Sequence, residues 1–239
     1  MTIRRRRDIN VLVIDIGGSH AKFRVWGKRQ KRKFATGTRT TPAQLAARVV
    51  AMTKDWKYDA VSIGYPGFVV HGKIARDPKN LGRGWVGFHF ERYFHKPVKI
   101  INDAAMQALG SYRGGRMLFL GLGTNLGSSL ILDDVVIPLD LGQLGYSEQE
   151  TLGDVLSKES LVRYGWNAWQ QAVHKTTERL ALAFRADYVV IGGGNVRLLK
   201  RLPGRSRRGS NNYSFTGGAR LWGLAGLEAT PRKHTWVIT

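Results

Sequence analysis

The sequence VLVIDIGGS at residues 11–19 decides the fold of this chain. Its apolar run, interrupted only by Asp15, predicts a buried strand over residues 10–16. Gly17 and Gly18 predict a tight turn after that strand, and the alternating pattern over residues 21–27 predicts a second strand. The chain therefore opens with a strand–turn–strand unit that holds one carboxylate at the end of its first strand.

The same kind of unit returns near the middle of the chain. A strand, a glycine-rich turn and two further strands are predicted in order at residues 117–122, 121–127, 128–132 and 135–137. Two such openings indicate a duplicated α/β fold. We expect a domain boundary near residues 108–115, with an N-terminal domain over residues 1–110 and a C-terminal domain over residues 111–239.

Capping residues and periodicity predict the other elements. Thr41 suits the N-cap of a helix, and Pro42 suits its first turn. Further helices are predicted over residues 104–109, 167–184 and 217–227, with strands over residues 59–64, 99–101 and 188–191. A polar loop is predicted at residues 211–216.

The composition fits a globular protein that buries real cores. The chain has 239 residues, of which 43% are hydrophobic, and no apolar run approaches the ~20 residues that cross a bilayer. The basic start of the chain is followed by no apolar signal region, so we expect a soluble, cytoplasmic protein. Cysteine is absent, which excludes disulfides, thiolate zinc sites and cysteine nucleophiles.

The net charge of +21 is the most unusual bulk feature. Basic residues cluster over residues 1–33 and again over residues 197–208. The second of these clusters contains no acidic residue. A charge of this size attracts polyanions. The alternative is a solvated basic surface that aids solubility, and the sequence leaves both interpretations open.

Three glycine turns follow apolar strands, at residues 17–18, 121–127 and 192–194. Without Cβ atoms a backbone approaches an anion closely and points several N–H groups at it, and Ser19 or Thr124 could add a hydroxyl donor. Each turn alone is explained equally well by a tight hairpin. None of them carries a Walker or dinucleotide-binding pattern.

Asp15 and Asp103 each stand at the carboxyl end of a predicted strand, from which open α/β sheets present catalytic groups. A carboxylate there accepts a proton from an attacking hydroxyl, or holds Mg²⁺ through water against phosphates. The alternative for Asp103 is a cap on the helix that follows it, and a cap is compatible with catalysis.

These motifs, taken together and in order, resemble one known family. The set is DIGGS at residues 15–19, GYPG at 64–67, NLGRGW at 80–85, NDA at 102–104, GLGTNLG at 121–127 and GGG at 192–194. It is similar to the ROK family of sugar kinases and repressors, and within it to the polyphosphate glucokinases, including the polyphosphate/ATP glucomannokinases. The resemblance implies the two-domain actin-like, ribonuclease H-like (hexokinase-type) fold with a cleft between the domains.

The resemblance also implies a role for each matched position. Asp103 would be the general base that activates the 6-hydroxyl of a hexose, and Asp15 would hold Mg²⁺ through water. The sugar-binding residues that it implies are Pro66, Gly67, Asn80, Asn102 and Asp103. The phosphate-binding and donor-binding residues are Asp15, Gly17, Gly18, Ser19, Gly123, Thr124, Asn125, Gly127, Gly192, Gly193 and Gly194.

The chain departs from the family pattern at the sugar site. Where the family commonly has Glu-x-Gly-His, this chain has Asp140 to Gln143, and Gly145 stands where a sugar-binding Glu is usual. We keep Asp140 as a candidate sugar contact, and Glu148 as a replacement for the missing Glu. The family's cysteine-rich zinc motif is absent and the six histidines show no ligand spacing, so we expect no zinc, with His89 and His95 at the surface.

The donor and the class of protein remain two linked questions. The charge favours polyphosphate as at least one donor, with ATP as the other, and glucose or mannose as the expected hexose. About nine residues precede the first strand, which leaves no room for the DNA-binding helices of ROK repressors, so we expect no specific DNA binding. The alternative is a catalytically weakened relative that binds a sugar or a polyanion such as nucleic acid. A homodimer is also implied by the resemblance.

Overall fold

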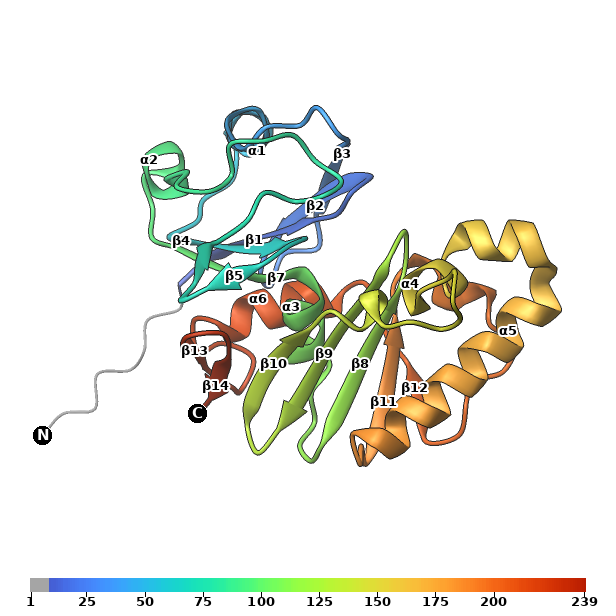
Figure 1. Ribbon diagram of the computed structural model, residues 1–239. Helices are drawn as coiled ribbons and strands as arrows, with labels where there is room; N and C mark the ends of the chain where they lie inside the picture. Colours follow the sequence, from blue (N-terminus) through green and yellow to red (C-terminus); the bar gives the residue numbers. More distant parts are fainter. Residues whose placement is uncertain (1–8) are drawn as a thin grey trace, which may run out of the picture.

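The structure, a computed structural model, describes residues 9–239, so Arg4, Arg5, Arg6 and Arg7 of the first basic cluster lie outside the described residues. Two mixed sheets dominate it (Figure 1). The first has five strands in the order β3-β2-β1-β4-β7 and the second has seven in the order β12-β11-β8-β9-β10-β14-β13, with a separate hairpin of β5 and β6.

The strands of the first sheet are β1 (Val11–Ile16), β2 (His20–Val25), β3 (Arg32–Ala35), β4 (Ala60–Tyr65) and β7 (Val98–Asn102), and the hairpin is β5 (Val69–Val70) with β6 (Lys73–Ile74). Those of the second are β8 (Met117–Leu122), β9 (Leu126–Leu132), β10 (Val135–Leu139), β11 (Tyr188–Gly192), β12 (Ser206–Arg208), β13 (Ala229–Pro231) and β14 (Trp236–Ile238). The helices are α1 (Pro42–Met52), α2 (Phe90–Phe94), α3 (Asp103–Ser111), α4 (Leu152–Val155), α5 (Lys158–Ala183) and α6 (Tyr213–Arg220), with 3₁₀ turns η1 (Leu141–Gln143) and η2 (Gly194–Leu198).

The two sheets repeat one topology. In the first, β1 pairs antiparallel with β2, β2 antiparallel with β3, and the parallel partners β4 and β7 follow on the other side of β1. In the second, β8, β9, β10, β11 and β12 take the same places with the same directions. The predicted duplication is therefore confirmed. The sheets lie in separate halves of the sequence, and the predicted boundary between them at residues 108–115 stays a prediction.

The helices and sheets form alternating layers, which explains why the central strands are apolar on both faces. Val11 and Val13 of β1 face a core around α3 and α6, while Leu12 and Ile14 face a core with α1 and α2. The alternate residues of β8 divide in the same way between the α3–α6 layer and the core beneath α5. Figure 1 shows α3 and α6 between the two sheets.

Helices α3 and α6 cross at two glycines. A Cβ built on Gly110 would overlap the Tyr213 carbonyl oxygen, and one on Gly217 would overlap the Met106 carbonyl oxygen. The helix from each half packs against the sheet of the other half, since α3 contacts β8, β9 and β10 and α6 contacts β1 and β4. This exchange joins the two halves through a backbone contact that only glycine permits.

Two predicted segments near the C-terminus are wrong. Most of the polar loop predicted at residues 211–216 is the first part of α6, which begins at Tyr213 and ends at Arg220 rather than continuing to residue 227. Gly217 and Gly218 were expected to sit at a helix start, but they lie inside the helix because the packing against α3 and β1 needs small residues there. After Arg220 the chain leaves the helix and turns at Gly223, whose φ is +72°.

The long helix also begins earlier than predicted. The stretch α5 starts at Lys158 and not at residue 167, with Ser157 as its N-cap. Gly165 has φ +81° and ψ 167°, so it interrupts the helical backbone and separates a short first segment from the predicted one. Among residues 9–239, no helix is both long and apolar enough to span a membrane.

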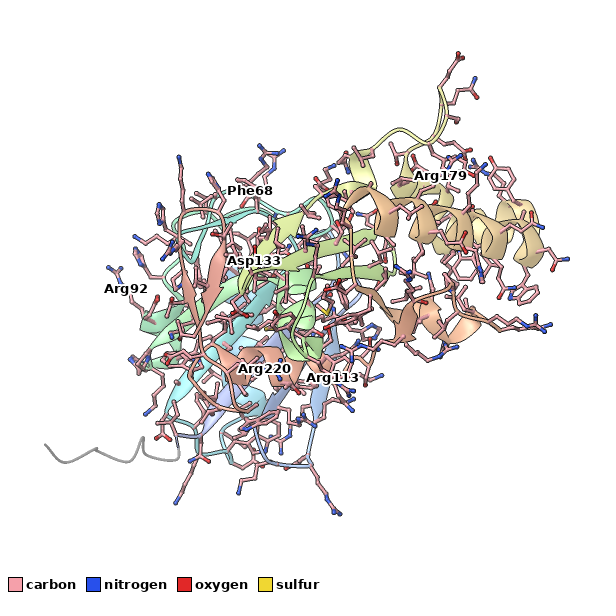
Figure 2. The ribbon with its side chains drawn as sticks, turned by 90° about the horizontal axis from the view of Figure 1, so that it is seen from below. Phe68, Arg92, Arg113, Asp133, Arg179 and Arg220 are labelled. Atoms are coloured by element: carbon pink, nitrogen blue, oxygen red, sulfur yellow. The ribbon has the colours of Figure 1, made fainter. Side chains whose placement is uncertain are left out.

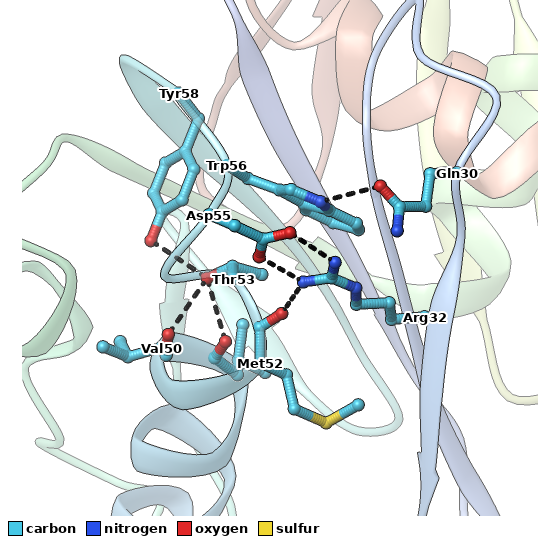
Figure 3. Close-up of polar contacts among 9 residues, drawn as sticks. Gln30, Arg32, Val50, Met52, Thr53, Asp55, Trp56 and Tyr58 are labelled. Atoms are coloured by element: carbon cyan, nitrogen blue, oxygen red, sulfur yellow. Dashed lines mark hydrogen bonds and ion pairs between the residues drawn. The ribbon is translucent and has the colours of Figure 1, made fainter.

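Arg32 shows that part of the basic charge has a structural use (Figure 3). Its guanidinium donates to both carboxylate oxygens of Asp55 at 2.6 Å, and also to the Met52 carbonyl oxygen at the end of α1. The same group lies 4.4 Å from the centre of the Trp56 ring. The hydrogen bonds from Arg32 lower the pKa of Asp55 to about 2. This contact fastens β3 to the end of α1.

Candidate active site

The carboxyl ends of three parallel strands meet at one edge of the first sheet. The register pairs Asp15 of β1 with Gly64 of β4, and Tyr65 of β4 with Asn102 of β7. A Cβ built on Gly64 would lie 3.5 Å from the Cα of Asp103. The sheet therefore brings Asp15, the GYPG segment and the Asn102-Asp103 pair together, as their places in the sequence predicted.

Asn102 is the residue that caps α3. Its side-chain oxygen accepts a hydrogen bond from the Ala105 N–H at 3.0 Å, and its amide donates to the Gly67 carbonyl oxygen at 3.2 Å. Asp103 is the first helical residue, and it accepts the neighbouring Ala104 N–H at 2.8 Å. The alternative in which Asp103 serves as the N-cap is wrong, because the preceding amide takes that place and fixes Gly67 as well.

Asp103 is partly exposed, whereas Asp15 is buried. Desolvation raises the pKa of Asp103 to about 7, and the negative charge of Asp15 adds to the rise, opposed by hydrogen bonds from the backbone. Desolvation also raises the pKa of Asp15, opposed by the positive charge of Lys22 and by the Ser214 hydroxyl. The pair thus resists holding two negative charges at neutral pH, and one of its carboxyls is poised to exchange a proton.

The first glycine turn lies beside Asn80, a residue predicted to bind the sugar. The Gly17 N–H donates to the His20 carbonyl oxygen at 2.9 Å, and the Gly17 carbonyl accepts from the Thr36 hydroxyl at 2.7 Å. A Cβ built on Gly18 would lie 3.2 Å from the Cβ of Asn80. The same turn therefore forms the predicted hairpin and packs closely against Asn80. Ser19, at the end of this turn, is exposed.

The segment around Asn80 is held by an acid that the sequence did not single out. Asp77 accepts the Trp85 N–H at 2.8 Å and the Gly84 N–H at 3.3 Å, and the Trp85 indole donates to the Gly82 carbonyl oxygen at 2.8 Å. The hydrogen bond from the Trp85 N–H, above all, lowers the pKa of Asp77. These hydrogen bonds hold the loop around Asn80, which has no helix or strand of its own.

The second and third glycine turns also approach this edge. A Cβ built on Gly127 would lie 3.1 Å from the Cβ of Ala104, so the β8–β9 hairpin contacts the start of α3 beside Asp103. The Asn195 amide donates to the Gly123 carbonyl oxygen at 3.2 Å and ties η2 to that hairpin. Gly193 has φ +82° and packs on the backbone of Leu122, so this position requires glycine. Thr124 and Asn125 are exposed, and so is Gly194, while Gly192 is buried.

Asp140 and Glu148, the two further candidate sugar contacts, take no part in the hydrogen bonds that join the other site residues within residues 9–239. Asp140 is exposed and precedes η1, and Glu148 is exposed in a loop closed by a hydrogen bond from the Tyr146 N–H to the Glu150 carbonyl oxygen. Their roles stay predictions. Gln143 accepts a hydrogen bond from the ammonium group of Lys79 at 3.5 Å, which places it next to Asn80.

Lys22 and Ser214 are neighbours of Asp15 that sequence reasoning missed. The hairpin register pairs Asp15 with Lys22, so counting outward from the Gly17 turn would have found the lysine. No local pattern could have found Ser214, because it comes from α6, almost two hundred residues further along the chain.

Residues 9–239 contain no group of three or more His, Asp or Glu side chains arranged to hold a metal. The Asp15 carboxylate suits a Mg²⁺ ion that arrives with donor phosphates, because such an ion keeps most of its ligands as water and phosphate oxygens. His89 and His95 are exposed, as predicted.

The basic side chains are widely distributed. Figure 2 shows Arg92, Arg113 and Arg179 on separate parts of the surface, and all three are exposed. Within the second basic cluster, Arg207 donates to the Ser111 carbonyl oxygen and Arg208 to the Leu199 carbonyl oxygen, the latter at 2.9 Å. These two arginines therefore bind backbone carbonyl groups of the protein itself, and the remaining cluster residues Arg197, Lys200, Arg201 and Arg205 are exposed.

The repeated sheets, and the carboxylates and glycine turns at their edge, define the class of fold: it is the actin-like, hexokinase-type α/β fold, as predicted. Within that class, the similarities of this chain are to ROK kinases, which confirms the resemblance read from its motifs. No family model matches the chain.

Three known proteins carry these similarities. The chain is 25% identical over 212 residues to a polyphosphate glucokinase of Mycobacterium leprae, covering 79% of this chain and 64%, just under two thirds, of that protein. The inorganic polyphosphate/ATP-glucomannokinase of Arthrobacter sp. strain KM superposes with a TM-score of 0.77 at 21% identity, covering 91% of this chain and 99% of that one. A ROK family glucokinase of Streptomyces griseus, solved with glucose and AMPPNP, gives a TM-score of 0.75 at 18% identity over 89% and 98% of the two chains. The two solved structures share the fold of this chain.

Proposed function

We propose that this protein is a hexose kinase that transfers the terminal phosphoryl group of polyphosphate, ATP or both to the 6-hydroxyl of a hexose, with glucose or mannose as the first candidates. Asp103 is the general base of this reaction. The observation that carries the proposal is the Asp103 carboxyl itself, partly exposed, with a pKa of about 7, at the start of α3 between two glycine turns.

A base with a pKa near the working pH suits this chemistry, because it is deprotonated often enough and still accepts a proton readily. The sugar oxygen attacks the terminal phosphorus, its proton passes to a carboxylate oxygen of Asp103, and the bond from phosphorus to the bridging oxygen breaks. The remaining phosphate chain leaves with the bonding electrons. Asn102 fixes the direction of Asp103 through the cap on Ala105 and the contact with Gly67.

The other groups hold the reactants. Asn80 and Asn102 would bind sugar hydroxyls, and Gly18, Ser19 and the turn at Gly123 would donate N–H groups to donor phosphates. A Mg²⁺ ion bound with the donor would neutralise developing charge on the transferred phosphoryl group. Asp15 would hold this ion through water, and the ion would in turn favour the ionised form of the Asp15 carboxyl.

A matrix assay tests the proposal. Glucose, mannose and other hexoses are each offered with ATP and with polyphosphate, and product is measured for the parent and for Asp103→Asn. We expect at least one pairing to turn over and the variant to lose about 100- to 10,000-fold in kcat, with polyphosphate binding retained. Equal turnover by parent and variant would remove Asp103 from the mechanism.

A second candidate function is favoured by the variant motif. Gly145 has no side chain to offer a sugar, and Gln143 contacts Lys79. A protein with a weakened sugar site and an intact basic surface would bind a hexose or a polyanion without turnover. The matrix assay, combined with calorimetry, separates the kinase from this second candidate. The second candidate predicts that calorimetry detects binding of a hexose or a polyanion while no pairing of hexose and donor gives product.

A further inference from the structure

A hollow of about 570 Å³ opens on the first sheet, between the end of β3 and the start of α1. Arg39 and Arg48 supply two guanidinium groups to its wall, and Thr38, Thr40 and Gln44 supply polar side chains. No carboxylate lines it. The two arginines are exposed, and the Arg48 guanidinium lies over the Phe34 ring, 4.6 Å from its centre.

The wall of the hollow is joined to the first glycine turn by hydrogen bonds. Thr36, one residue before the hollow's Gly37, donates its N–H to the Ser19 carbonyl oxygen at 2.9 Å and its hydroxyl to the Gly17 carbonyl oxygen at 2.7 Å. On the other side, the Thr40 carbonyl oxygen accepts the Gly82 N–H at 3.0 Å. The hollow therefore lies next to the turn at Gly17 to Ser19 and to the Asn80 loop, at the same end of the sheet as Asp103.

The chemistry of this wall suits phosphate. Guanidinium groups bind phosphate oxygens with two parallel hydrogen bonds, and threonine hydroxyls and the Gln44 amide add neutral donors. The Thr40 hydroxyl already accepts the Gly37 N–H at 3.0 Å, which leaves its own hydrogen to donate. The triphosphate of ATP ends in a nucleoside, whereas a long polyphosphate chain continues past the transfer site as further phosphates that need their own binding site.

We propose that this hollow, through Arg39 and Arg48, binds the distal phosphates of a donor chain longer than a triphosphate. The proposal rests on the proposed function for its donor, but the hollow and its charges exist independently of catalysis. It gives the protein a preference for long phosphate chains that acts on donor binding and leaves the transfer step unchanged.

The test removes the two guanidiniums and compares the result with an equal loss of charge elsewhere. The variant is Arg39→Gln with Arg48→Gln. The matched control is Lys175→Gln with Arg201→Gln, at the separate hollow beside α5. Both lower the net charge by two, so any general electrostatic effect is the same in each. Binding of long-chain polyphosphate and of tripolyphosphate is measured by calorimetry at fixed ionic strength, and KM for ATP and for both phosphate chains is measured alongside.

We expect the Arg39/Arg48 variant to bind long-chain polyphosphate about tenfold more weakly than the control variant does. Tripolyphosphate binding, the KM for ATP and kcat should match the control. Arg39→Lys with Arg48→Lys, which keeps the charge and loses the paired hydrogen bonds, should fall between the two. Thermal unfolding checks that the loss of the Arg48 contact with Phe34 leaves the fold intact.

The outcomes separate the two proposals. If the variant and the control bind long-chain polyphosphate equally well, and the protein uses polyphosphate as a donor, the proposed phosphate site in the hollow is wrong and the proposed kinase activity is unaffected. A selective loss of long-chain binding in a protein that turns over no donor supports the hollow and rejects the kinase. A loss that is equal for tripolyphosphate and for the long chain also overturns the proposal, because it would mean that the arginines act on the phosphates nearest the transfer site.

Discussion

The raised pKa of Asp103 costs the folded state stability whenever its carboxyl is ionised. In the unfolded chain this carboxyl titrates near its ordinary value of 3.8, and in the folded protein near 7. Between these values the folded state binds more protons, so stability falls as pH rises from about 4 to 7 and stays lowered above that. The full penalty is roughly 2 kcal/mol, once the shift is discounted for the partial exposure of the side chain.

Asp103→Asn should therefore stabilise the protein at pH 8 and leave it unchanged at pH 4. The amide cannot ionise, and its oxygen still accepts the Ala104 N–H. We expect a rise in Tm of roughly 5 °C at pH 8. Calorimetric scans of parent and variant at both pH values measure it. The same shift at pH 4 and pH 8 would show that ionisation is not its cause.

Asp15 raises the pKa of Asp103 through its negative charge, so its removal should move that pKa down. In Asp15→Asn we expect the Asp103 carboxyl to titrate at lower pH, and the acid side of the pH profile of any remaining activity to move the same way. Carboxyl ¹³C NMR follows the titration without depending on turnover. Asp133→Asn, at the exposed β9–β10 turn, removes an equal charge and should leave Asp103 unchanged.

At the scale of elements, the contact between α3 and α6 reverses an ordinary rule. Inside a helix, alanine is favoured over glycine by ~1 kcal/mol. At Gly110 and at Gly217 the added Cβ would overlap a backbone carbonyl oxygen of the facing helix, which cannot rotate away. We therefore expect Gly110→Ala and Gly217→Ala each to destabilise the protein by ~3 kcal/mol, the upper end of the usual cost of overpacking.

Urea unfolding measures these two changes. Gly204→Ala is the matched control, because a Cβ there meets nothing within 4 Å. Its free energy of unfolding should stay within about 0.5 kcal/mol of the parent. If Gly110→Ala or Gly217→Ala were neutral or stabilising, the two helices would not be in backbone contact.

The sequence predicted elements wherever a local signal was strong. Strand β8 matches its predicted residues, and α1 begins as Thr41 and Pro42 indicated, with Gln44 completing the capping box. The failures lie where a distant contact decides. Two adjacent glycines usually end a helix, yet Gly217 and Gly218 lie inside α6 because α3 and β1 press against them. Strands β13 and β14 are short and had no pattern of their own.

At the scale of the whole molecule, the duplicated topology explains why most of the candidate site could be predicted. Strand ends and glycine turns recur at fixed places in each half, so ordered motifs indicated Asp15, Asn102 and Asp103 together. The groups that act across the fold could not be predicted, because Ser214 reaches Asp15 from α6 and Asp77 holds a loop without regular structure. The sugar contacts at Asp140 and Glu148 stay predictions for the same reason.

The charge of the whole molecule makes the last prediction. The protein has 38 basic and 17 acidic residues, so a bound polyphosphate chain contacts many basic side chains. Each such contact releases counterions that had gathered on the polyphosphate. Raising the salt concentration from about 50 to about 200 mM should therefore raise the KM for long-chain polyphosphate by about tenfold or more. The KM for an uncharged hexose should stay nearly constant, because no ions are released when it binds. Kinetics at both salt concentrations, with osmolality held equal, measure the two values in one experiment. A polyphosphate KM as insensitive to salt as the hexose KM would mean that the basic surface takes no part in donor binding and serves only solubility.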